Sequence, residues 1–280
     1  MHGQCSASAE LSKNRAWAGG KSSAWAAQSQ LAVGIRLHYP RQSAPSVRSP
    51  TSLGGLANSN SVARSETPRF SRAEERAHYF SHGLGAALAV PAAVLLVLLA
   101  ARRSPATLVG CAIYAGALVV MYAASTAYHA TPYAMPRTKH AFHVLDHCAI
   151  FLLISGTYTP LALTVLHNAR GYVLLAMVWA MSLFGLYLVI LRRDPRHGGP
   201  LLLYLALACS VALTLPELTL ALGSRALLLL LTGGVSYLLG VPFYVLHRIR
   251  YHHAIWHAFV LLGSALHFIA MLEFVVPYRH

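Results

Sequence analysis

Residues 104–136 read SPATLVGCAIYAGALVVMYAASTAYHATPYAMP and contain no Asp, Glu, Lys or Arg. A helix that spans a bilayer needs about 20 consecutive apolar residues at about 1.5 Å of rise per residue. Because lipid offers no partner to backbone N–H and C=O groups, an apolar run of this length predicts a helix, whose hydrogen bonds are internal. We therefore expect one membrane-spanning helix in this run, over Thr107–Tyr128.

Outward from this run, long apolar stretches recur through the chain from residue 83 onward. The seven stretches are Gly83–Ala101, Thr107–Tyr128, Phe142–Leu166, Gly171–Leu191, Pro200–Leu218, Ala226–Leu246 and Ala254–Val276. Short connections carrying Arg, Lys, His, Pro and Gly separate them. This pattern predicts an all-α polytopic membrane protein, a seven-transmembrane helix bundle.

The composition agrees with a membrane protein. Of the 280 residues, 56% are hydrophobic and 11% are charged, against about a quarter charged in an ordinary soluble domain. These figures exclude a disordered protein and a typical soluble enzyme. The net charge of +14 would suit nucleic acid, but membrane proteins also gather basic residues in their cytoplasmic loops. We expect membrane lipids as partners and no nucleic acid.

The segment before the apolar stretches differs from the rest of the chain. Residues 1–73 are rich in Ser, Ala, Gly, Arg and Pro, with Glu10 and Glu66 as their acidic residues. They show no sustained apolar period and no apolar run typical of a signal peptide, which predicts a disordered basic leader. An organelle transit peptide is the alternative. Residues 74–280 form the predicted transmembrane domain.

The placement of Lys and Arg predicts the orientation of the bundle. The side that holds the N-terminus carries ten basic residues near the helices: Arg69, Arg72, Arg76, Arg137, Lys139, Arg192, Arg193, Arg196, Arg248 and Arg250. The other side carries five: Arg102, Arg103, Arg170, Arg225 and Arg279. Because the basic side faces the cytoplasm, we expect a cytoplasmic N-terminus and an outer C-terminus.

The 16 histidines are not scattered evenly over the predicted helices. Four helices carry polar residues at the predicted cytoplasmic end: His78, Ser81 and His82; Ser125 and His129; His143, Asp146 and His147; and His252, His253 and His257. A random distribution over fourteen helix ends would not bring them to one face. The sequence therefore predicts a polar site there.

The spacing of these residues indicates a metal site. Ser125 and His129 are four residues apart, as are His253 and His257, so each pair shares one helix face. Three imidazoles with a nearby carboxylate, Asp146, are typical of a zinc site whose open fourth position holds a water. Asp146 would orient that water or take its proton.

Each residue also has a simpler interpretation. Histidines at helix ends are often interfacial, which fits His140, His167, His197, His247, His252 and His280. His267 lies deeper and fits a packed, hydrogen-bonded residue. Asp146 has an alternative as a salt-bridge partner of Arg137 or Lys139, and Ser125 as a residue bonded to its own helix backbone.

Several ordered motifs resemble those of the hemolysin III family, which belongs with the progestin and adiponectin Q receptors and is more distantly similar to the alkaline ceramidases. The motifs are Glu74-Glu75-Arg76-Ala77-His78-Tyr79-Phe80-Ser81-His82-Gly83, Ser125-Thr126-Ala127-Tyr128-His129, Leu145-Asp146-His147-Cys148, Ser155-Gly156-Thr157-Tyr158-Thr159-Pro160, His253-Ala254-Ile255-Trp256-His257 and Gly263-Ser264-Ala265-Leu266-His267-Phe268. They cover residues 74–277, the whole predicted membrane part.

This resemblance implies a zinc ion held by His129, His253 and His257 on the cytoplasmic side. It implies that Asp146 holds the zinc-bound water and that Ser125 lines the same site, so both are candidate catalytic residues. The opening motif departs from the family pattern, which usually has Asn where this chain has His78. The roles of the first-helix residues Glu75, His78 and His82 are left open.

Three functions follow as hypotheses. The first is a zinc-dependent hydrolase of amide or ester bonds in membrane lipids, with ceramide-like substrates implied by the resemblance. The second is a receptor or regulator of membrane state with structural zinc. The third is a pore-forming cytolysin, as the family name implies, although a pore favours polar rings through the whole membrane thickness. The resemblance also implies an integral protein of a bacterial inner (plasma) membrane.

Overall fold

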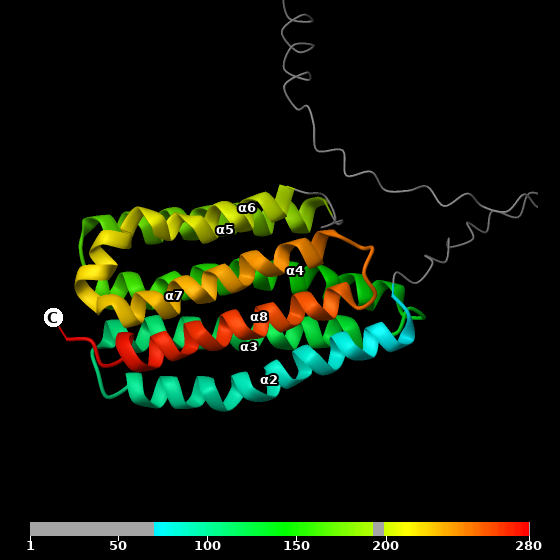
Figure 1. Ribbon diagram of the computed structural model, residues 1–280, viewed down its shortest axis with the longest axis horizontal. Coiled ribbons are helices and arrows are strands. Elements are labelled where there is room, and N and C mark those ends of the chain that lie inside the picture. The colour runs from blue at the N-terminus through cyan, green and yellow to red at the C-terminus, as the bar shows by residue number, and fades with distance from the viewer. Residues whose placement is uncertain (1–69, 193–198, 280) are drawn as a thin grey trace, which may run out of the picture. The chain divides into compact units, whose positions relative to one another are not determined.

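The computed structural model describes residues 70–192 and 199–279, and every regular element in them is helical. In chain order the elements are α2 (Arg72–Ala100), α3 (Pro105–Ala130), α4 (Pro136–Pro160) with a π turn η1 (Leu161–Val165), α5 (Ala169–Arg192), α6 (Gly199–Cys209) with a 3-10 turn η2 (Ser210–Thr214), α7 (Leu215–Val245), and α8 (His252–Ala270) with a π turn η3 (Met271–Val275). The all-α prediction is confirmed. The helices lie side by side along one direction (Figure 1).

Six helical segments of the described residues are long and apolar enough to cross a membrane. They are Arg72–Ala100, Pro105–Ala130, Pro136–Val165, Ala169–Leu191, Gly199–Val245 and His252–Val275. Each of five contains one predicted span, except for at most one residue at its C-terminal end, and Gly199–Val245 covers two in the same way. The chain is thus a polytopic membrane protein, whereas seven separate passes and a cytoplasmic N-terminus stay predictions.

The segment Gly199–Val245 is not one straight helix. Its 47 residues would measure about 70 Å as a single helix, more than twice the hydrocarbon thickness of about 30 Å. Gly223 interrupts it with φ 77° and ψ 174°, a backbone conformation that glycine adopts readily. Gly223 lies between the predicted spans Pro200–Leu218 and Ala226–Leu246, and α6 and most of α7 run in opposite directions (Figure 1).

Helix α2 begins eleven residues before the predicted first span. Ser71 caps it: its side chain accepts a hydrogen bond from the Glu74 backbone, and Glu74 bonds back to the backbone of Ser71. With 29 residues, α2 is about 43 Å long and exceeds the hydrocarbon core. The extra turns at its start therefore extend the bundle at the end where the predicted polar site lies.

The packing order places α4 in the middle of the bundle. In its most apolar stretch 72% of the residues are buried, against 22% in α2. Helix α2 packs against α3 and α8, and α7 packs against α8. The start of α2, the end of α3 and the starts of α4 and α8 lie at one end of the bundle (Figure 1), which we call the His end.

Helices α7 and α8 approach closely at Gly233. A Cβ atom there would lie 2.4 Å from the His267 ring and 3.1 Å from the carbonyl oxygen of Gly263. A Cβ at the neighbouring Gly234 would meet nothing within 4 Å. Gly233 is therefore a close helix contact that leaves room for the half-buried His267 ring, as is common where helices pack in membranes.

Residues 1–69, which make up most of the predicted leader (residues 1–73), lie outside the described residues. Residues 193–198, which include two of the basic residues used to predict the orientation, also lie outside them. The predictions for these segments are therefore untested.

Candidate metal centre

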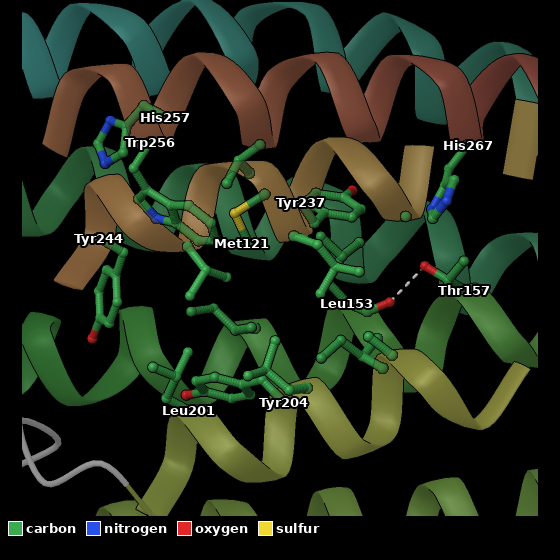
Figure 2. A pocket seen from close by; sticks show the side chains of 18 of the residues that line it. Met121, Leu153, Thr157, Leu201, Tyr204, Tyr237, Tyr244, Trp256, His257 and His267 are labelled. Atoms are coloured by element: carbon green, nitrogen blue, oxygen red, sulfur yellow. Dashed lines mark hydrogen bonds between the residues drawn. The ribbon is translucent and has the colours of Figure 1, made fainter. Parts of the chain in front are cut away.

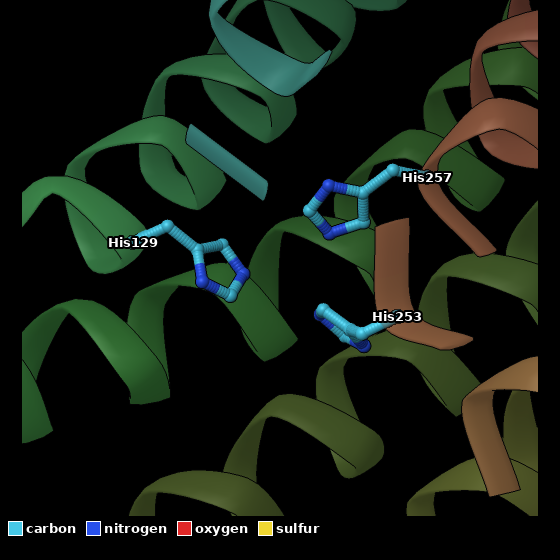
Figure 3. A group of neighbouring side chains, drawn as sticks. All are labelled: His129, His253 and His257. Atoms are coloured by element: carbon cyan, nitrogen blue, oxygen red, sulfur yellow. The ribbon is translucent and has the colours of Figure 1, made fainter. Parts of the chain in front are cut away.

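Three histidines from two helices converge at the His end. His129 lies on the last turn of α3, and His253 and His257 lie one turn apart on α8. One ligand nitrogen of each lies within 4.8 Å of those of the other two. Their rings point toward a common centre (Figure 3). The structure thus brings together the three residues that the spacing and the resemblance had suggested as ligands.

The first helix holds His129 in place. Nδ1 of His129 lies 2.7 Å from Oε2 of Glu75, and Lys139 Nζ lies 3.1 Å from Oε1 of the same carboxylate. A carboxylate only accepts, so Nδ1 carries the proton and Nε2 keeps its lone pair. That Nε2 atom is buried and has no hydrogen-bond partner among the described residues. It is therefore available to a metal ion.

His257 is oriented in a similar way by Ser81. The Ser81 hydroxyl donates to the His78 carbonyl oxygen at 2.9 Å and lies 2.9 Å from Nδ1 of His257. Because the single hydroxyl proton is already used, Nδ1 of His257 is the donor of the second bond. Nε2 of His257 is then unprotonated, which is the state that binds metal.

A chain of polar side chains runs from α2 to α4 beside the three histidines. His82 Nδ1 lies 2.7 Å from Ser125 Oγ, and the carboxyl group of Asp146 lies near the same hydroxyl. A hydroxyl can accept the N–H of His82 and at the same time donate to a carboxylate. Among the described residues Ser125 thus bonds to His82 and not to its own helix backbone, and Asp146 lies beside the site and outside the three-histidine group.

His78 also lies in this cluster, although the spacing of residues in the sequence did not indicate it as a ligand. It is fully buried, and its ring centre lies 4.7 Å from that of His129 and 4.9 Å from that of His253. A second group able to hold a metal consists of Glu75, His78 and His129. His129 therefore belongs to both groups.

Phe70, which comes just before α2, covers the cluster. Its ring lies edge-on to His78 at 4.7 Å and stacked with His253 at 5.5 Å. The side chain is 7% exposed. Phe70 therefore separates this part of the cluster from solvent.

The simpler interpretations have mixed outcomes. His267 is indeed a packed residue, bonded through Nε2 to the Leu230 carbonyl oxygen at 3.0 Å. His252 is buried and bonds to the Phe243 carbonyl oxygen at 2.8 Å, so the interfacial interpretation was wrong for it. Lys139 pairs with Glu75, and the ion pairs of the described residues include none with Asp146.

An apolar cavity of about 200 Å³ runs from the His cluster into the bundle. The lining includes the polar residues His82, Ser125, Asp146, His253 and His257 and the apolar residues Leu161 and Leu230. Figure 2 shows His257 at one end of the cavity and His267 at the other, with Met121, Leu153 and Tyr237 between them. His257 and His267 are ten residues apart on α8, which corresponds to about 15 Å along the helix axis. The polar site therefore opens into an elongated apolar space.

Three residues of the first helix have no role assigned from the sequence. Glu75, His78 and His82 follow the i, i+3, i+7 pattern of one helix face, and all three face the candidate metal centre. Their spacing is a usable signal. It is easily overlooked because these residues precede the first predicted span.

These features define a class: an integral membrane protein formed of packed apolar helices, with a histidine cluster able to hold a metal ion at one end. Residues 70–268 match the family model described as haemolysin-III related. The chain belongs to the hemolysin III family.

The relatives of this chain span most of its membrane part. It is 34% identical to hemolysin-3 of Bacillus cereus over 73% of this chain and 93% of that protein. It is 35% identical to a hemolysin-3 homolog of Bacillus subtilis over 74% of this chain and 97% of that protein. It is 29% identical to the human monocyte to macrophage differentiation factor over 58% of this chain and 69% of that protein.

Proposed function

We propose that this protein is a zinc-dependent hydrolase that cleaves amide or ester bonds of membrane lipids in a bacterial plasma membrane. The observation that carries the proposal is the junction of two features. A histidine cluster, in which His129 Nε2 is buried and has no hydrogen-bond partner among the described residues, meets an elongated apolar cavity, and Asp146 and Ser125 line that cavity.

The donor set suits zinc. Imidazole nitrogens are among the usual ligands of zinc, although they also bind copper, iron and nickel. His129 Nε2 is a buried acceptor that has no hydrogen-bond partner in the described part of the chain, and such an atom is costly unless an ion or water meets it. Bound there, zinc would supply a Lewis acid that activates water and polarises a carbonyl group.

Asp146 is the proposed proton acceptor of the reaction. It is partly buried and lines the cavity, where its carboxylate can accept a hydrogen bond from the nearby Ser125 hydroxyl. One carboxylate oxygen then remains for a proton taken from an attacking water. Ser125, itself bonded to His82, holds the carboxylate in position.

The cavity supports a lipid as the substrate. Leu153, Leu161, Leu230 and Met121 provide an apolar lining next to the polar cluster, which suits an acyl chain with its carbonyl group at the histidines. An acyl chain bound in the cavity is removed from water, and burial of its apolar surface stabilises the complex by about 25 cal/mol per Å². The more distant similarity of the hemolysin III family to the alkaline ceramidases favours lipid amides among the candidates.

The test is hydrolysis of a lipid panel by purified protein in vesicles. Ceramides, other lipid amides and lipid esters are offered to zinc-loaded protein and to protein stripped by a chelator, and released fatty acid is measured. We expect zinc-dependent cleavage of at least one lipid class. His140→Ala, which changes an exposed histidine outside the cluster, serves as the control and should cleave as wild type does. Absence of cleavage across the panel by zinc-loaded wild type would refute the proposal.

A further inference from the structure

His78 presents two buried nitrogens that no other side chain satisfies. The side chain has no exposed surface, and neither ring nitrogen has a hydrogen-bond partner among residues 70–192 and 199–279. Its nearest carboxylate oxygen, Oε2 of Glu75, lies 3.8 Å from Nδ1, beyond hydrogen-bond reach. Polar groups as deeply buried as this one are rarely unpaired in folded proteins, and a bound ion is one of the partners that can satisfy them.

The four rings of the cluster are spaced as four ligands of one ion would be. With a zinc–nitrogen distance of about 2.0–2.1 Å, four imidazoles at tetrahedral angles have ring centres about 5.2 Å apart. The observed separations are 4.7 Å for His78–His129, 4.9 Å for His78–His253, 5.5 Å for His78–His257, 5.2 Å for His129–His253, 5.2 Å for His129–His257 and 4.6 Å for His253–His257. All six lie within about 0.7 Å of the tetrahedral value.

From this arrangement we infer that His78 is a fourth ligand, which closes the metal site of His129, His253 and His257. The inference rests on the proposed metal centre and gives it a closed state. Four protein ligands are typical of structural zinc sites, whereas three ligands and a water are typical of catalytic ones. In this chain, binding of His78 to the ion would give the four-ligand type of site, and its release would give the three-ligand type with a water.

The position of the His78 ring shows how release can occur. By distance, His78 groups with Glu75 and His129, so its ring must turn to bring a nitrogen to the ion shared with His253 and His257. Rotation of an imidazole about its last torsion has a broad energy profile, and no hydrogen bond fixes this ring within the described part of the chain. Turned the other way, the ring would bring Nδ1 closer to the Glu75 carboxylate, which lies 3.8 Å away in the structure and could then accept a hydrogen bond from it.

His78 therefore has two alternative partners, the metal ion and Glu75. Bound to an ion, His78 would take the place of a water ligand. Turned toward Glu75, it would leave that place free for water.

Zinc-edge X-ray absorption of the full-length, zinc-loaded protein tests the inference without a substitution. We expect four imidazole nitrogens per zinc in wild type, and three plus one oxygen in His78→Asn. His78→Gln is a second variant in case the first does not fold, and His140→Ala is the matched control with four. In competition with a chelator, His78→Asn should bind zinc at least about 10-fold more weakly, since loss of even a supporting group costs that much.

The outcomes separate this inference from the proposed function. Three imidazoles and an oxygen in wild type, unchanged in His78→Asn, would overturn the role of His78 and leave the three-histidine centre intact. Four imidazoles in wild type with no cleavage of any lipid would support the role of His78 and refute the hydrolase. If the hydrolase also holds, His78→Asn should cleave lipid faster per bound zinc than wild type. Wild type that binds no zinc would refute both.

Discussion

Polar side chains are exposed at one end of the bundle and buried at the other. At the far end, Arg170 pairs with Glu217 at 2.7 Å and Arg225 with Glu273 at 3.3 Å, and both arginines are largely exposed. At the His end, Glu75 is 12% exposed and the histidines it contacts have no exposed side-chain surface.

The difference distinguishes polar groups that solvent can satisfy from those that it cannot. Exposed ion pairs contribute little to stability, because water screens the charges and the long side chains lose conformational entropy. Buried imidazoles without partners cost free energy, so their arrangement at the His end indicates a ligand. Substitutions and reporters at the two ends can test this contrast, from the largest expected effect to the smallest.

The first prediction assigns the two ends to compartments and is all-or-none. A reporter fused after Arg279 should be periplasmic or extracellular, and one inserted between Arg192 and Gly199 should be cytoplasmic, because Lys and Arg concentrate on the latter side. Alkaline phosphatase, active outside the cytoplasm, and a fluorescent protein, active inside, are the paired readouts. The reverse result would place the His end outside.

The second prediction concerns the metal itself. The double variant His253→Ala/His257→Ala removes both α8 ligands and should lower bound zinc from about one per chain to near zero, since two imidazoles are too few for a stable site. Metal analysis of purified protein is the measurement, with His140→Ala as the control. Zinc retained in full would instead place the ion at the group of Glu75, His78 and His129.

The third prediction separates catalysis from metal binding. Asp146→Asn keeps the size of the side chain and removes its charge and basicity, so lipid hydrolysis should fall by about 10²–10⁴, the usual contribution of a general base. Zinc should stay largely bound because the histidines are unchanged. Glu273→Gln, at the far end, is the control. Loss of zinc in Asp146→Asn would instead make Asp146 a ligand.

The fourth prediction concerns the carboxylate behind His129. Glu75→Gln weakens the hydrogen bond to His129 Nδ1 and should lower zinc affinity by about 10–100-fold, as for other groups that orient metal-binding histidines. The adjacent Glu74→Gln is a matched control, because Glu74 contacts Ser71 and the Tyr251 backbone instead. Equal affinities of the two variants in chelator competition would contradict a specific role of Glu75.

The smallest effect is expected at the far end. Arg225→Ala removes an exposed ion pair and should change the free energy of unfolding by less than about 1 kcal/mol. Its thermal midpoint should then shift by no more than about 2–4 °C. Zinc content should equal that of wild type. A larger shift in thermal unfolding would mean that the ion pair supports the packing of α7 against η3.

Much of the fold was predictable because the bilayer leaves few alternatives. Long apolar runs must be helices in lipid, so the stretches around Thr107–Tyr128 and Gly171–Leu191 were located to within a few residues. The start of α2 was missed by eleven residues. Its first turns, with Glu75 and His78, are polar and lie before the apolar run that marks the span.

The candidate site was only partly predictable. His253 and His257 are one turn apart, a local relation that spacing reveals. The pairing of Glu75 with His129 joins residues 54 positions apart, and that of Ser81 with His257 joins residues 176 apart. Such contacts depend on how α2 packs between α3 and α8, and helical periodicity carries no information about that packing.

The sequence by itself determined that this chain is a helical membrane protein with its histidines concentrated at one end. Apolar length and helical spacing are local properties, and the bilayer converts them directly into structure. Only the tertiary structure decided that a fourth histidine, His78, lies among the other three, with its nitrogens unpaired among the described residues. Burial and partnership depend on neighbours supplied by other helices, so they exist only once the bundle has packed.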